Sequence, residues 1–488
     1  MRTGDRPVPA FAAFMLLAAS ILSLAESGSA RAAILGSHVS DRTSLTLGGT
    51  LYFAAQDGTH GSELWRSDGT KAGTVMVKDI QPGRFGSSPY SFTAVGGTLY
   101  FDAYDSTHGD ELWRSDGTEA GTYMVKDISP GAGDSNIFLA NPTNVGGTLV
   151  FTANDGVHGQ ELWRSDGTAN GTVTVRDIRP GPGSSDPLSL TEANGTVFFT
   201  ARDGIHGREL WRSDGTMSGT VMVRDLWPGS VGGLRGYGPT FDPVSLTSVG
   251  GSVFFNASDG PDRVLDLWTS DGSTGGTVLL LETEIRPARG DPLIYEMAGV
   301  GETLYFAMKA PNDDAELWKS DGTPSGTVDI GDVLPGVYWV FSLGSLTDFG
   351  GTLYFDGASH LWKSDGTAEG TVAVKPIPPA YRLRPPMVPL GNNLYFSATD
   401  IVHGPELWKS DGTAGGTVMV KDISPGSRGS GPGYFADVEG TAYFVADDRT
   451  SGPELWRSDG TKAGTVMVKD INPGSKGSSP SNLIFVPA

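Results

Sequence analysis

The chain contains no cysteine, and it has fewer basic than acidic residues. Without thiols it can form no disulfide, no thiolate metal site, no cysteine nucleophile and no lipid-modified cysteine. Lysine and arginine number 35 against 56 aspartates and glutamates, which gives a formal net charge of −21. Because nucleic acids and anionic membranes attract basic proteins, this balance argues against both as partners.

Long apolar runs are also scarce, and only the N-terminal region carries one. Arg2 and Arg6 precede an apolar stretch from Ala10 to Leu24, which Ala30-Arg31-Ala32 follows. This order is typical of a secretory signal, and the run is too short to span a bilayer comfortably. We therefore expect residues 1–32 to be a signal peptide and residues 33–488 to be one exported domain, secreted or at the cell surface, without a transmembrane segment. A cytoplasmic protein with an apolar first helix is the less favoured alternative.

Helical periodicity is missing as well, whereas glycine is abundant. The chain has 70 Gly and 31 Pro, which excludes a long-helix or coiled-coil protein. Hydrophobic residues make up 38% of the chain and include 11 Trp, 14 Tyr and 21 Phe, which is enough for a large core and excludes disorder of the whole chain.

The sequence is dominated by a repeat. The string Glu-Leu-Trp-x-Ser-Asp-Gly, or a close variant, recurs nine times without an intervening linker. Its tryptophans are Trp65, Trp113, Trp163, Trp211, Trp268, Trp318, Trp362, Trp408 and Trp456.

Each unit contains four extended segments separated by turn sequences. In the second unit these segments are 90–95, 98–103, 111–115 and 122–128. Gly96-Gly97 suits a tight hairpin, and the Ser-Asp-Gly-Thr-x-x-Gly segment suits a longer one. β-branched and aromatic residues dominate between the turns. The unit is therefore predicted to be a four-stranded antiparallel meander.

Apolar residues point to both faces of these strands. Leu112 and Trp113 are neighbours and so lie on opposite faces of the sheet, as do Tyr100 and Phe101. Small sheets packed in a row and closed into a ring cover both faces. We therefore predict an all-β fold, a β-propeller of about nine four-stranded antiparallel blades. An eight-bladed ring with one irregular copy and two smaller rings are alternatives, and a β-solenoid is a weaker rival.

The C-terminal segment 478–486 resembles the stretch that opens the second unit, Ser87 to Val95, but no further unit follows it. In the first unit, the corresponding 42–47 segment matches less well. We predict that 478–486 supplies the first strand of the first blade and closes the ring.

The nine ELWxSDGT strings and the GTxMVKDIxPG segments resemble those of the bacterial ELWxxDGT-repeat proteins, sometimes called hyalin-like. The resemblance covers about residues 44–486. It implies a secreted or surface-associated repeat protein, and the family offers no established activity or catalytic residue to carry over.

Repeated acidic residues raise the question of metal binding. An aspartate follows serine in all nine Ser-Asp-Gly turns, and an acid precedes Leu-Trp in eight copies. Carboxylates in glycine-rich turns could bind calcium, with Asp68, Asp116, Asp166 and Asp214 as candidates, although the EF-hand pattern is absent. We favour a structural interpretation without a cofactor, in which each Asp caps its turn and each Glu pairs with the basic residue after Trp, such as Arg66 or Lys319.

Five histidines occur in the pattern D-x-x-H-G-x-E-L-W: His60, His108, His158, His206 and His403. A histidine beside carboxylates could bind zinc or act as a base. Because these histidines belong to five separate units, we predict instead that each bonds to a backbone or carboxylate group of its own blade.

Departures from the repeat are the better guide to a single site. Three insertions follow the fourth, sixth and seventh tryptophan at the same place in the unit and should emerge on one side of the ring. Aromatic residues in loops are common anchors for sugars and peptides. The ligand-binding candidates are Trp227, Tyr237, Tyr338, Trp339, Tyr381 and Arg382. The alternative is that they only fill gaps beside degenerate blades.

No motif for a nucleophile elbow, a zinc protease, a phosphate loop or a dinucleotide site is present. We therefore favour a secreted or surface binding module, expected to be a monomer, that presents loops to a glycan or another extracellular protein. The alternatives are an extracellular polysaccharide hydrolase or lyase with one site at the ring mouth, and a structural component of a matrix or envelope.

Overall fold

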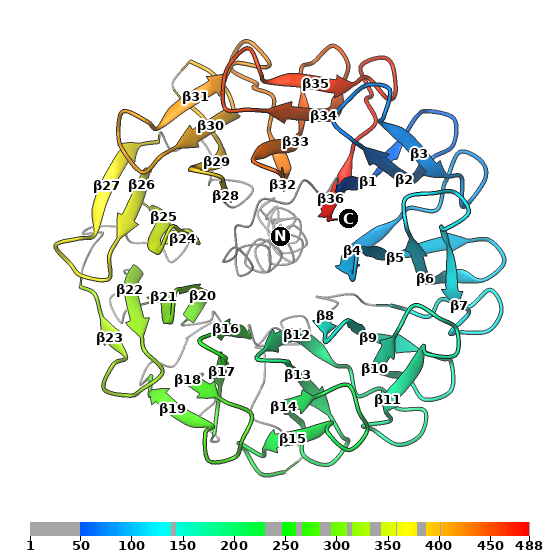
Figure 1. Cartoon of the computed structure of the whole chain (residues 1–488). Coiled ribbons are helices and arrows are strands. Elements are labelled where there is room, and N and C mark those ends of the chain that lie inside the picture. The colour runs from blue at the N-terminus through cyan, green and yellow to red at the C-terminus, as the bar shows by residue number, and fades with distance from the viewer. Residues whose placement is uncertain are drawn as a thin grey trace, which may run out of the picture.

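The computed structural model describes residues 49–137, 143–229, 246–259, 266–283, 294–309, 315–331, 343–357, 359–377, 387–400 and 402–487. Their strands form nine four-stranded antiparallel sheets arranged as a nine-bladed β-propeller, which confirms the predicted fold class (Figure 1). The predicted signal peptide, residues 1–32, lies outside the described residues. Within the described ranges, no helix is long and apolar enough to cross a membrane.

Every blade has an innermost first strand and an outermost fourth strand (Figure 1). In blades 1 to 9 the first strands are β36 (Ser481–Val486), β4 (Tyr90–Val95), β8 (Thr143–Val145), β12 (Leu188–Ala193), β16 (Thr247–Val249), β20 (Ile294–Val300), β24 (Leu343–Phe349), β28 (Val388–Leu390) and β32 (Gly433–Val438). The second strands are β1 (Thr50–Gln56), β5 (Thr98–Asp105), β9 (Thr148–Asn154), β13 (Thr196–Arg202), β17 (Ser252–Ala257), β21 (Thr303–Lys309), β25 (Thr352–Gly357), β29 (Asn393–Ala398) and β33 (Thr441–Asp447). The third strands are β2 (Ser62–Ser67), β6 (Gly109–Ser115), β10 (Gln160–Ser165), β14 (Arg208–Ser213), β18 (Asp266–Ser270), β22 (Ala315–Ser320), β26 (His360–Ser364), β30 (Glu406–Ser410) and β34 (Pro453–Ser458). The fourth strands are β3 (Val75–Lys78), β7 (Tyr123–Lys126), β11 (Val173–Arg176), β15 (Val221–Arg224), β19 (Val278–Leu281), β23 (Val328–Asp329), β27 (Val372–Pro376), β31 (Val418–Lys421) and β35 (Val466–Lys469).

The meander gives the ring two different edges. Hairpins between second and third strands lie at the same edge as the segments that join one blade to the next, because successive strands run in opposite directions. We call this edge the connection face. The Ser-Asp-Gly turns, between third and fourth strands, lie at the opposite edge.

The predicted strands of blade 2 match the observed ones, with differences at their ends. β4 has the predicted bounds, whereas β5 and β6 extend two residues further into the hairpin that joins them. β7 ends at Lys126, two residues before the predicted end. The main-chain N–H of Ile128 donates to the Glu111 carboxylate (2.9 Å) and therefore does not continue the strand pairing.

Both faces of each blade are buried, as the sequence pattern predicts. Leu112 is fully buried, and Trp113 is 7% exposed. Trp113 packs in one cluster with Tyr52 and Val77 of blade 1, while Leu112 packs in the next cluster with Phe151 of blade 3. The core is therefore a set of apolar layers between successive blades.

The ring closes through the C-terminal strand. β36 lies beside β1 (Figure 1). The two strands pair antiparallel, with Thr50 opposite Val486 and Tyr52 opposite Ile484. The predicted closure is confirmed, and blade 1 is built from both ends of the described chain.

Basic residues on the fourth strands tie neighbouring blades together. Each donates to the main-chain oxygen of a threonine in the next blade (2.5–2.8 Å) and lies over that blade's tryptophan ring (5.5–6.0 Å). The pairs are Lys78–Thr122, Lys126–Thr172, Arg176–Thr220, Arg224–Thr277, Lys375–Thr417, Lys421–Thr465 and Lys469–Thr74. Blades 5 and 6 carry Leu281 and Gly331 at this position, neither of which has a side-chain donor. Two neighbouring interfaces therefore lack this link.

We expect Lys126→Met to cost about 2 kcal/mol of unfolding free energy, because it removes a charged hydrogen bond and a cation–π contact. Chemical denaturation of the two proteins measures the difference. The exposed Lys71 offers a control, since Lys71→Met should change stability little. Equal losses for the two variants would contradict the role of the link.

Candidate functional site

A buried glutamate in the third strand fixes the segment that leaves the blade in several of the repeats. In blade 3, the Glu161 carboxylate is fully buried and accepts hydrogen bonds from the main-chain N–H groups of Ile178 and Ser185 (both 2.9 Å). It also accepts one from the Ser185 hydroxyl (2.6 Å). Glu63, Glu406 and Glu454 do the same in their blades. The glutamate therefore sets the path of the connection face.

The predicted pairing of these glutamates with the basic residue after Trp is wrong. Glu63 binds the connection, and Arg66 is exposed. Residues three apart in a strand point to opposite faces, so Glu63 and Arg66 cannot meet. In other blades the basic residue reaches the next Ser-Asp-Gly turn, since Lys319 Nζ donates to the Gly366 carbonyl (2.7 Å).

The calcium candidates Asp68, Asp116, Asp166 and Asp214 each cap their own turn. Asp68 Oδ1 accepts hydrogen bonds from the Thr70 hydroxyl (2.7 Å) and main-chain N–H (2.8 Å), and these bonds lower the pKa of Asp68. The other three aspartates make the same pair of bonds to Thr118, Thr168 and Thr216. Among the described residues, no three His, Asp or Glu side chains gather as a metal site. The structural role without a cofactor stays a prediction, with calcium binding as its alternative.

The five histidines bond within their own hairpins, as predicted. His60 Nδ1 lies 2.7 Å from the Asp57 carboxylate, and the other four pairs span 2.6–2.9 Å. This hydrogen bond raises the pKa of each histidine. The histidines brace the hairpins of the connection face.

We expect the protein to be more stable at pH 5 than at pH 8. Burial raises the pKa of Glu111 and of Glu161 to about 7. Between the ordinary glutamate pKa and this value, both side chains are protonated in the folded state and ionised in the unfolded state, so the free energy of unfolding falls as the pH rises. The raised histidine pKa values act in the same direction, because the stability that they contribute is lost as the pH rises through them. Thermal melting should show a midpoint several degrees higher at pH 5.

Glu161→Gln removes one titrating group and should reduce this difference between the two pH values. A midpoint that rises from pH 5 to pH 8 would contradict the assignment.

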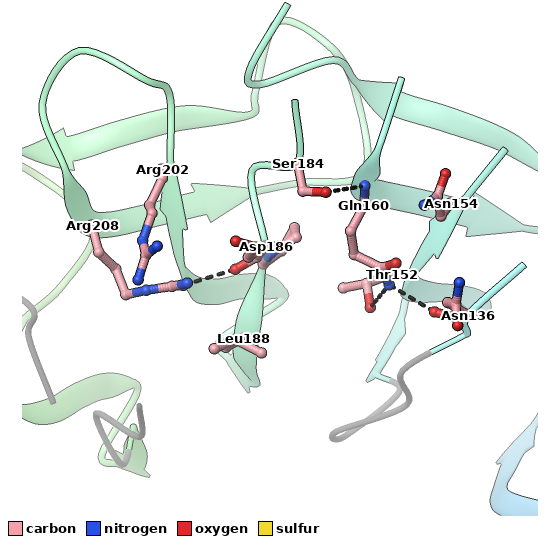
Figure 2. A pocket seen from close by; sticks show the side chains of 10 residues that line it. Asn136, Thr152, Asn154, Gln160, Ser184, Asp186, Leu188, Arg202 and Arg208 are labelled. Atoms are coloured by element: carbon pink, nitrogen blue, oxygen red, sulfur yellow. Dashed lines mark hydrogen bonds between the residues drawn. The ribbon is translucent and has the colours of Figure 1, made fainter. Parts of the chain in front are cut away.

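A polar pocket lies on the connection face between blades 3 and 4. Its volume is about 430 Å³, within the range of small-molecule sites. Asn136, Thr152, Asn154 and Gln160 come from the blade 3 side, Ser184, Asp186 and Pro187 from the connection, and Leu188, Arg202 and Arg208 from blade 4. Figure 2 shows the two arginines on one side of Asp186 and the amide side chains on the other.

Hydrogen bonds hold the pocket walls in place. Gln160 Nε2 donates to the Asn136 carbonyl (2.9 Å) and to Thr152 Oγ1 (3.0 Å), and the Gln160 main-chain N–H donates to Ser184 Oγ (3.0 Å). Arg208 Nη1 donates to the Asp186 carbonyl (2.7 Å), as Figure 2 shows. The walls therefore need little rearrangement before a ligand binds.

The pocket residues stand at positions that vary among the nine copies. Blades 6, 8 and 9 carry Ala315, Pro405 and Pro453 where blade 3 has Gln160. Where blade 3 has Thr152, blades 1 and 9 carry Ala54 and Val445. The fold thus accepts small or apolar residues at these positions.

Of the sequence-based ligand candidates, only Trp227 belongs to the described residues. Trp227 is half-buried in the segment after β15 and does not line the pocket. Tyr237, Tyr338, Trp339, Tyr381 and Arg382 lie outside the described residues. Sequence reasoning did not identify the pocket residues, because it looked for a single binding site only in the insertions. Comparing substitutions position by position across the nine copies would have revealed Gln160 and Arg208.

No family model matches the chain, and no curated protein matches it in sequence. Similar solved structures include a puromycin hydrolase at 16% identity and a TM-score of 0.39, covering 81% of this chain and 54% of the hydrolase. The computationally designed Ika8 protein is 14% identical with a TM-score of 0.40, covering 74% of this chain and 94% of Ika8. BamB from Moraxella catarrhalis is 12% identical with a TM-score of 0.32, covering 66% and 80%. The chain thus spans about half of the hydrolase, and similarities this distant do not bear on its activity.

Proposed function

We propose that the protein is an exported, non-enzymatic binding module, secreted or held at the cell surface, whose ring presents its connection face to an extracellular glycan or protein. The signal-like segment 1–32 and the resemblance to secreted ELWxxDGT-repeat proteins support export. The pocket between blades 3 and 4 supports binding.

One observation carries this proposal. Side chains with amide, hydroxyl and guanidinium groups from blades 3 and 4 converge on one pocket, although several other blades carry small or apolar residues at the positions of Gln160 and Thr152. A purely structural spacer has no need for such a convergence.

Binding and turnover can be measured together. The chain would be immobilised and exposed to extracellular polysaccharides and surface proteins from bacterial cultures, and bound ligand would be checked for cleavage. We expect reversible binding without change in the ligand, weakened by Gln160→Ala. Release of shortened or unsaturated fragments would contradict a non-enzymatic role.

A further inference from the structure

We infer that the pocket between blades 3 and 4 binds a short saccharide through the sugar hydroxyl groups. This inference rests on the proposed binding function and names the ligand class of the same site.

The amide of Gln160 is oriented so that it offers an acceptor. Its Nε2 hydrogens are both used, one by the Asn136 carbonyl and one by Thr152 Oγ1. No described residue donates to Oε1, so this carbonyl oxygen can accept a hydrogen bond from a ligand. The orientation is fixed before binding, which lowers the entropy lost on association.

Asn154 and Ser184 offer the complementary donors. Asn154 Oδ1 accepts the Gly156 main-chain N–H (2.8 Å), which leaves its Nδ2 group as a donor. Ser184 Oγ accepts the Gln160 main-chain N–H, which leaves its own O–H as a donor. The pocket thus combines fixed donors with a fixed acceptor. Neighbouring hydroxyls of a sugar match this combination, because each hydroxyl can donate and accept.

Pro187 and Leu188 add an apolar wall to this polar set. Pro187 is buried and Leu188 is partly exposed, and both line the pocket beside Asp186. The Arg208 bond to the Asp186 carbonyl anchors this wall. A pyranose ring has C–H faces as well as hydroxyl edges, so it can contact the wall while its edge meets the amides.

A peptide fits this site less well. Extended peptides bind by adding a strand to a free sheet edge. The strands that supply half of the lining residues, β9, β10, β13 and β14, are each paired on both sides, and β12 contributes only Leu188. The site therefore offers side-chain groups instead of a main-chain ladder, which favours the saccharide.

The test uses two pairs of matched variants. Gln160→Ala introduces the residue that blade 6 carries as Ala315, and Ser62→Ala makes the same change at the equivalent position of blade 1. Asn154→Ala is matched by Gln56→Ala in the same way. Melting curves confirm that all four variants fold.

The full chain would be screened on an array of mono- and oligosaccharides, and the strongest hit would be titrated by calorimetry. We expect one site per chain, about tenfold weaker binding for Gln160→Ala and Asn154→Ala, and unchanged binding for both blade 1 variants. The inference is overturned if no saccharide binds, or if both blade 3 variants bind as the parent does. If an extracellular protein binds instead and Gln160→Ala weakens it, the saccharide inference fails and the proposed function stands.

Discussion

Removal of β36 is expected to have the largest effect on stability. A chain that ends at residue 477 lacks the inner strand of blade 1, so β1 loses its pairing with residues 481–486. The buried Val486 and the partly buried Ile484 leave the layer between blades 1 and 2. The Glu454 carboxylate also loses the two hydrogen bonds that Ser478 donates.

Together these losses should lower the unfolding free energy by on the order of 5 kcal/mol, comparable to the whole stability of many domains. The unpaired edge of β1 should also promote aggregation. Denaturant unfolding and size-exclusion chromatography measure both effects. A chain that ends at residue 486 retains β36 and is the control. If both truncated chains melted like the parent, the ring would not depend on this strand.

Substitution of Trp113 by alanine is expected to cost about 3–5 kcal/mol, because it opens a cavity between blades 1 and 2. Trp113 is 7% exposed and contacts both blades of this layer. Its indole nitrogen has no hydrogen-bond partner among the described residues, so packing supplies the stability. Trp113→Phe should therefore retain a large part of it.

Trp362 in blade 7 provides the comparison. It holds the same place in its repeat but is only partly buried, so Trp362→Ala should cost less than Trp113→Ala. Unfolding midpoints of the three variants rank the effects. A Trp113→Ala protein with the melting curve of the parent would contradict the packed layers.

The fold could be predicted because the apolar pattern within each strand and the number of repeats both indicate a closed ring of small sheets. Pairs such as Leu112–Trp113 require cover on both sheet faces, and nine copies of such a unit fit a ring. The spare segment 478–486 indicated how the ring closes. Strand ends were less accurate, because they depend on contacts such as that between Ile128 and Glu111, which are 17 residues apart.

The candidate site was harder to predict because it depends on contacts between neighbouring units. Gln160 meets Asn136 and Ser184, each 24 residues away and on opposite sides in the sequence. In a sequence built from repeats, a single change such as Gln160 looks like ordinary variation. The role of Glu63 was mispredicted for a related reason, since the assignment ignored the direction in which strand residues point.

Closure by β36 also sets an order of events during synthesis. The ribosome completes β1 long before it reaches β36, so during that interval β1 lacks the strand that pairs with it in the folded ring. A polypeptide shortened by a premature stop codon would keep an unpaired edge on β1, which chaperones and proteases could recognise. Among the nine described blades, the one whose second strand is made first is thus the last to be finished.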